Sequence, residues 1–126
     1  MLQQTKSNKL PKLFLYTIIF LFGTTLYGQS PVYFTATDAA TDFTIAELNT
    51  RVAAAPGGWT GEVIFNNIAV NIPANAFRNY VGGLTKITFI GNIGTIGSQA
   101  FYFIDALLSV EFYDDVNVID LEAFRG

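Results

Sequence analysis

Residues 84–101 read LTKITFIGNIGTIGSQAF, and residues 107–124 read LLSVEFYDDVNVIDLEAF. The two stretches share a leucine, a β-branched residue two positions before a phenylalanine, a pair of isoleucines or valines, and a final Ala-Phe. A third Ala-Phe stands at Ala76-Phe77, so that the three phenylalanines are separated by 24 and 23 residues. A repeat of this length cannot bury its apolar face alone. The period therefore predicts a solenoid, in which neighbouring coils stack.

The triplet of a β-branched residue, any residue and phenylalanine predicts a short strand in each repeat. It occupies residues 63–65, 87–89 and 110–112, and its middle residue is polar in the last two copies. Such alternation directs the first and third side chains into the core and the middle one to solvent. In-register stacking of the coils predicts these neighbours: Ile87 beside Val110, Phe89 beside Phe112, and Phe77 beside Phe101 and Phe124.

The residues that alternate outward from these strands are the candidate binding residues. They are Ile64, Thr88 and Glu111, flanked by Lys86 and Ser109. Because a solenoid displays a surface and does not enclose a catalytic pocket, we expect a ligand to meet the exposed side of the sheet.

One helix is predicted ahead of the repeats, at residues 44–55. Thr44 and Glu47 fit a capping box, in which the hydroxyl accepts from the amide three residues on and the carboxylate bonds back to the threonine amide. Pro56 ends the helix. We interpret the helix as an N-terminal cap, since the first coil of a solenoid would otherwise expose its apolar face. Residues 32–34 are interpreted as a lone strand.

The N-terminus has the layout of a secretory signal peptide. Three lysines precede an apolar run of ten residues (13–22), and small and polar residues follow up to Gly28. As a helix the run spans about 15 Å, half of a hydrocarbon layer of about 30 Å. A cleaved signal peptide (1–28) is therefore favoured over a membrane anchor, with the cleavage site approximate. The protein is expected to be secreted or at the cell surface, without a membrane span after cleavage.

Composition excludes several classes of function. Residues 29–126 hold all ten acidic residues and only four basic ones, so their formal charge is −6. Such a surface repels nucleic acid. Histidine and cysteine are absent, which removes disulfides, imidazole and thiol catalysis, and the usual zinc sites. The acidic cluster around Asp114 and Asp115 lacks the spacing of a calcium loop. No catalytic, cofactor-binding or metal-binding residue is predicted.

The repeats resemble the BspA-like leucine-rich repeats of bacterial cell-surface proteins. The matching residues are those of 84–101 and 107–124, in which a Leu-x-x-Ile strand, an Ile-x-x-Ile pair and an Ala-Phe turn follow one another. The resemblance covers about Val63 to Gly126. It implies an α/β leucine-rich-repeat solenoid with short parallel strands, and an adhesion module that binds a protein or glycan at a cell surface or in a matrix.

The expected organisation is a signal peptide (1–28), an N-terminal segment with the capping helix (29–62) and the repeats (63–126), of which the last is incomplete. We expect a truncated chain whose downstream repeats are missing. Two alternatives stay open. One is a right-handed β-helix that acts on polysaccharides, which would carry several strands in each coil and need no Ala-Phe turn. The other is a non-functional fragment of a larger surface protein.

Overall fold

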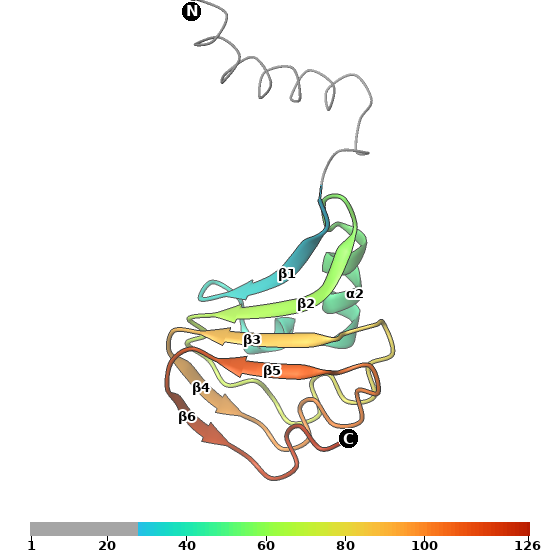
Figure 1. Cartoon of the computed structure of the whole chain (residues 1–126). Coiled ribbons are helices and arrows are strands. Elements are labelled where there is room, and N and C mark those ends of the chain that lie inside the picture. Colours follow the sequence, from blue (N-terminus) through green and yellow to red (C-terminus); the bar gives the residue numbers. More distant parts are fainter. Residues whose placement is uncertain (1–27) are drawn as a thin grey trace, which may run out of the picture.

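The structure is a computed structural model that describes residues 28–126. Residues 1–27, which hold nearly all of the predicted signal peptide, lie outside the described residues. The elements follow one another in this order (Figure 1): β1 (Ser30–Thr35), a short 3-10 helix η2 (Ala40–Asp42), α2 (Ile45–Ala53), β2 (Trp59–Asn66), β3 (Lys86–Ile90), β4 (Ile93–Ile96), β5 (Ser109–Phe112) and β6 (Val116–Ile119). In the part of the chain that the structure describes, no helix is long and apolar enough to cross a membrane.

The main sheet contains four parallel strands in the order β1-β2-β3-β5. The predicted register is confirmed. Ile87 pairs with Val110, and Phe89 pairs with Phe112, as expected from the aligned triplets. Each of the last three strands begins one coil: the β2 coil (59–84), the β3 coil (86–107) and the β5 coil (109–126). The parallel strands and helix α2 form an α/β repeat.

The prediction that residues 32–34 form a lone strand is wrong. They belong to β1, which pairs with β2 so that Val32 lies beside Val63 and Phe34 beside Phe65. Residues 32–34 are a fourth copy of the repeated triplet, placed 31 positions before the next one. The additional residues between these two copies form η2 and α2. Because the spacing is longer than the period of about 23 residues, the pattern of the other copies did not reveal this one.

A second, two-stranded parallel sheet lies further along the coils. It pairs β4 with β6, and a single bridge between Ile72 and Ile96 continues the pairing to the β2 coil. These strands coincide with the apolar pairs that recur seven residues after each strand phenylalanine. Each of the last two coils therefore carries two strands, which is the feature that the sequence associated with the β-helix alternative.

Phenylalanine rings fill the core in two columns. The strand column stacks Phe34, Phe65, Phe89 and Phe112 at centroid distances of 5.3, 5.1 and 4.9 Å. The turn column stacks the three Ala-Phe rings at 5.2 Å each, as predicted. Rings of the two columns meet edge to face, for example Phe89 and Phe101 at 6.2 Å. Such aromatic pairs contribute about 0.5–1.5 kcal/mol each beyond the burial of their area.

Helix α2 forms where the sequence predicts it, but only one of the two hydrogen bonds of the predicted capping box is present. The Thr44 hydroxyl accepts a hydrogen bond from the Glu47 amide at 3.1 Å, which confirms the first half of the capping box. The second half is wrong, because the Thr44 amide donates to the Asp42 carbonyl instead. The Glu47 carboxylate pairs with Arg51, one turn along the helix, at 2.8 Å. Leu48 joins the buried core on the same side of the sheet as Phe34 and Phe65.

Candidate binding face

The outward face of the main sheet brings the predicted binding residues together. One row across the four strands consists of Tyr33, Ile64, Thr88 and Glu111, which pair in register. A neighbouring row consists of Glu62, Lys86 and Ser109. We call these seven residues the outward sheet face. Helix α2 lies behind β1 and β2 in Figure 1, on the opposite side of the sheet, so it does not cover this face.

Lys86 lies at the centre of the face between two carboxylates. Its Nζ is 3.0 Å from Glu111 Oε2 and 3.6 Å from Glu62 Oε1. The Glu111 carboxylate also accepts a hydrogen bond from the Tyr113 hydroxyl at 3.0 Å. These contacts connect β2, β3 and β5, and they fix the positions of side chains that would otherwise be free to move. Two carboxylates and one ammonium leave the cluster with a negative charge.

The same contacts shift the acid–base properties of the face. The hydrogen bond from Lys86, and then that from Tyr113, hold the pKa of the Glu111 carboxyl below its usual value. The bond to Glu111 raises the pKa of the Lys86 ammonium. The bond to the Glu111 carboxylate also raises the pKa of the Tyr113 hydroxyl. Glu111 and Lys86 therefore both stay charged throughout the neutral pH range.

Thr88 occupies an outward position but is only 4% exposed. Its hydroxyl donates to Glu62 Oε1 at 2.6 Å, and the flanking side chains cover it. Thr88 therefore positions Glu62 and offers little surface of its own. The other predicted residues, Ile64, Lys86, Ser109 and Glu111, are half-buried.

Two residues of this region, Tyr33 and Glu62, were not predicted from the sequence as part of the face. Tyr33, which is 50% exposed, is the middle residue of the β1 triplet, and that copy was not recognised. Glu62 stands directly before the β2 triplet, at the position that Lys86 occupies in β3. Aligning all four triplets and extending them by one residue at each end would have found both. Tyr113, which bonds Glu111, directly follows the β5 triplet and is 66% exposed.

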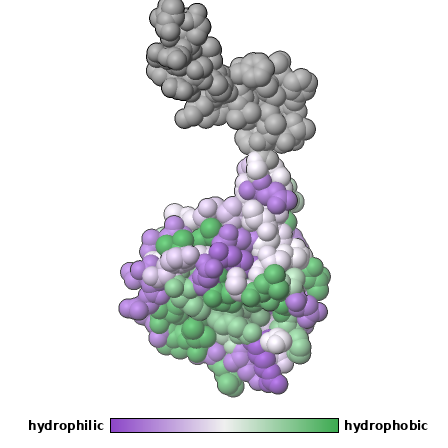
Figure 2. Space-filling view, in the orientation of Figure 1, coloured by the Kyte–Doolittle hydropathy of each residue, from purple (hydrophilic) through white to green (hydrophobic). Residues whose placement is uncertain are grey.

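Polar and hydrophobic residues share the surface of the described region unevenly. Figure 2, in the orientation of Figure 1, shows purple hydrophilic residues both at the edges of the view and in a group near its centre, with green hydrophobic surface beside and below that group. Ile90, which is 37% exposed, follows the β3 triplet as Tyr113 follows the β5 triplet. Together these two residues add an apolar area beside the charged cluster, a combination typical of protein-binding surfaces.

Parallel strands in register, with an Ala-Phe turn and a phenylalanine column in each coil, define a leucine-rich repeat protein. A family model described as BspA type leucine rich repeat region (6 copies) matches residues 60–126, and the chain belongs to this family. Repeats of the family are often surface-associated and protein-binding, and are typically not enzymatic. Comparison with curated proteins and with solved structures found no significant match.

Proposed function

We propose that this is a secreted or cell-surface protein that binds a protein partner through the outward sheet face, as an adhesion module. Membership of the BspA type repeat family carries the proposal. The face supports it, because four strands present one continuous row from Tyr33 to Glu111 with ordered charges and exposed aromatic rings. Tyrosines flanked by a polar network are typical of the residues that dominate protein interfaces.

The architecture that displays this face is a solenoid whose N-terminal end is closed by α2. Phe34 begins the strand column and has no exposed surface. The guanidinium of Arg51, from α2, lies 4.2 Å from the centre of that ring, and Phe43 packs on it at 5.3 Å. The first ring of the column is thus covered by residues of the segment that precedes the repeats. This supports a division into an N-terminal capping segment (29–62) and the repeats (63–126).

Protein is favoured over anionic glycans as the ligand, and nucleic acid is disfavoured. Residues 29–126 carry a formal charge of −6, and the Lys86 cluster is itself negative. A negative surface attracts basic partners and repels phosphate and sulfate polymers. Binding is therefore expected to weaken as salt concentration rises.

A binding assay on immobilised extracellular-matrix proteins and on whole cells tests this function. Tyr33→Ala removes an exposed ring at one end of the row, and Glu111→Lys reverses a charge of the Lys86 cluster at the other end; each is expected to lower binding at least about tenfold, as the loss of an interface hot spot does. Val81→Ala is the matched control, because Val81 is 93% exposed and lies outside the strands. Equal binding by all four proteins would place the partner elsewhere.

A second candidate function is a polysaccharide-acting β-helix, and the observation that favours it is the second strand in the β3 and β5 coils. A glycosidase of the common type needs two carboxyl groups about 5–10 Å apart across a substrate cleft. The release of new reducing ends from acidic glycans incubated with the protein would support this candidate. Unchanged glycan, together with binding to protein, would support the adhesion function.

A further inference from the structure

The Ala-Phe turns of the three coils align their polar side chains in two rows. Backbone hydrogen bonds join the turns, for example from the Phe77 amide to the Ala100 carbonyl at 2.7 Å. The residues directly before each Ala-Phe form one row and share a left-handed backbone, with φ of 61°, 57° and 58°: Asn75, Gln99 and Glu122. The residues directly after each Ala-Phe form the other row: Arg78, Tyr102 and Arg125. We call these six residues the turn face.

Arg78 is the basic residue of the turn face whose charge is not matched by a carboxylate. Residues 28–126 contain four basic residues. Arg51, Lys86 and Arg125 each form an ion pair with an acidic side chain within 3.0 Å. Within the same range of residues, Arg78 forms no ion pair, and its side chain is exposed. A positive charge is thus presented by a region whose formal charge is −6.

A chain of hydrogen bonds across the three coils holds the Arg78 guanidinium in place. Its Nη1 donates to Gln99 Oε1 at 2.9 Å. Gln99 is held in turn, because its Nε2 donates to Glu122 Oε2 at 2.8 Å. Arg125 donates to the other oxygen of the Glu122 carboxylate. The Arg78 side chain is therefore ordered before any ligand binds, which lowers the entropy cost of binding.

One edge of the Arg78 guanidinium is left unoccupied by these contacts. Its hydrogen bonds to residues 28–126, which go to Asn75 and Gln99, all come from Nη1. Nε and Nη2 therefore have no acceptor in the described part of the chain. Their N–H groups form a planar fork that matches the two oxygens of a carboxylate. The ring of Tyr102, whose centre is 5.0 Å from the guanidinium carbon, supports the plane of this fork.

Charge and surroundings favour a single carboxylate over other anions at this fork. Repulsion by the formal charge of −6 grows with the charge of the ligand, so phosphate groups and polyanions are disfavoured. A sugar acid would find little aromatic surface for its ring, because Arg78 lies over Tyr102 and Phe103 packs against Tyr102 at 4.5 Å. The carboxylate of an aspartate or glutamate side chain meets neither obstacle.

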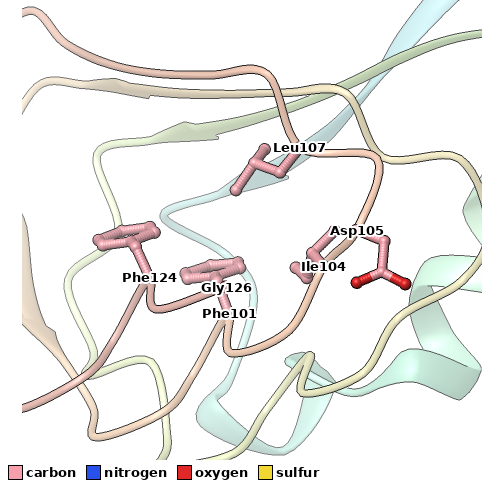
Figure 3. Close-up of a pocket in the computed structure, with 6 residues that line it drawn as sticks. All are labelled: Phe101, Ile104, Asp105, Leu107, Phe124 and Gly126. Atoms are coloured by element: carbon pink, nitrogen blue, oxygen red, sulfur yellow. The ribbon is translucent and has the colours of Figure 1, made fainter.

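A cavity of about 300 Å³ elsewhere in the molecule does not offer such a site (Figure 3). It is lined by Phe101, Ile104, Asp105, Leu107, Phe124 and Gly126. Asp105 is the one charged side chain among these six, and it would repel an anion. The donors for a carboxylate are therefore those of Arg78 on the turn face.

We propose that Arg78 is the centre of a second binding site, which takes one aspartate or glutamate carboxylate of a partner protein. Nε and Nη2 of Arg78 donate to the two carboxylate oxygens, while Gln99 and Tyr102 position the guanidinium. The site lies in the turns, outside the strands that form the outward sheet face. It takes an acidic group, whereas that face attracts basic ones, so either proposal can fail without the other.

Nuclear magnetic resonance of the Arg78 Nε–H group in the purified protein tests the site. The probe is N-acetyl-aspartate N-methylamide, and N-acetyl-asparagine N-methylamide is its uncharged counterpart of the same shape. At constant ionic strength, the aspartate probe is expected to shift the Arg78 signal to saturation, and the asparagine probe is not. The Nε–H signal of Arg51 is the internal control, because that group already donates to Glu47 at 2.8 Å.

Three variants, followed at the backbone amide signals of the turns, separate the fork from its charge. Arg78→Lys keeps the charge without the planar fork and is expected to weaken probe binding at least about fivefold. Arg125→Lys is the matched control in the same row, because Arg125 already pairs with Glu122, and it should leave binding unchanged. Gln99→Met removes the acceptor of Nη1 and should weaken binding about threefold. It should also broaden the Arg78 Nε–H signal, which a loss of contact area alone would not do.

Three results would overturn the proposal. The first is no saturable shift of the Arg78 signal in the wild-type protein, and the second is equal affinity of wild type and a folded Arg78→Lys variant. The third is tighter binding of glucuronate or inorganic phosphate than of the aspartate probe. That result would assign the fork to a sugar acid or a phosphate group in place of a protein carboxylate.

Discussion

At the scale of single residues, Arg51 joins more parts of the molecule than any neighbouring side chain of α2. Its guanidinium bonds Asp38 at 2.6 Å, Glu47 at 2.8 Å and the Tyr33 carbonyl at 2.8 Å, and it covers the Phe34 ring. Its side chain is only 24% exposed, so these contacts are partly shielded from water. These contacts fix α2 to the edge of β1. They also shield the ring of Phe34, the first in the strand column, from water.

Arg51→Met is expected to lower the free energy of unfolding by about 2 kcal/mol, because several charge-assisted hydrogen bonds are lost. Urea denaturation followed by circular dichroism measures this. Arg78→Met is the matched control, since Arg78 also lies over a ring, that of Tyr102 at 5.0 Å, but bonds no carboxylate. The control should lose less than about 1 kcal/mol. Equal losses would contradict the role given to Arg51.

The pair with Arg51 also makes stability depend on pH. The hydrogen bond from Arg51 is the main cause that holds the pKa of Asp38 below its ordinary value. A carboxyl whose pKa is lower in the folded state contributes stability above its unfolded pKa, and that stability is lost as the pH falls through the folded pKa. Denaturant midpoints should therefore fall on acidification below about pH 4. Asp38→Asn should be less stable at neutral pH and should show a smaller acid loss; an unchanged acid loss would contradict this account.

At the scale of elements, the repeated triplets were predictable because each coil places them in the same environment. The inward residues of β2, β3 and β5 recur at nearly constant spacing, since each must fill the same column. The missed features depend on tertiary contacts that have no period. Glu47 bonds Arg51 and not the Thr44 amide, because the Asp42 carbonyl already accepts from that amide. Thr88 is buried because the side chain of Glu62, on the neighbouring strand, covers it and accepts a hydrogen bond from its hydroxyl.

Position within the stack decides how much each strand phenylalanine contributes. Phe89 is 1% exposed and is stacked between Phe65 and Phe112, whereas Phe112 is 42% exposed and, among residues 28–126, stacks on Phe89 alone. Phe89→Ala should cost about 3–5 kcal/mol, as large cavities in cores do. Phe112→Ala should cost about half of that or less, because its area is only partly buried. Thermal unfolding of residues 28–126 carrying each change measures the difference, and equal losses would be inconsistent with the unequal burial of the two rings.

At the scale of the whole molecule, the sequence of the N-terminal segment leads us to propose where the protein acts. Secretion is proposed from the lysines and the apolar run within residues 1–28. Blots of medium, envelope and cytoplasm with an antibody against residues 41–59 should show the protein outside the cytoplasm. N-terminal sequencing should begin near Gln29. A cytoplasmic protein that keeps Met1 would contradict both secretion and adhesion.

Binding through the outward sheet face is tested by one comparison of variants. The wild-type protein and Glu111→Lys are compared for binding to cells and to immobilised matrix proteins, with Val81→Ala as control and circular dichroism to check folding. The account predicts saturable binding by wild type and control, and a loss of at least about tenfold in Glu111→Lys. Binding that the charge reversal leaves unchanged, or no binding by a folded wild-type protein, would contradict it.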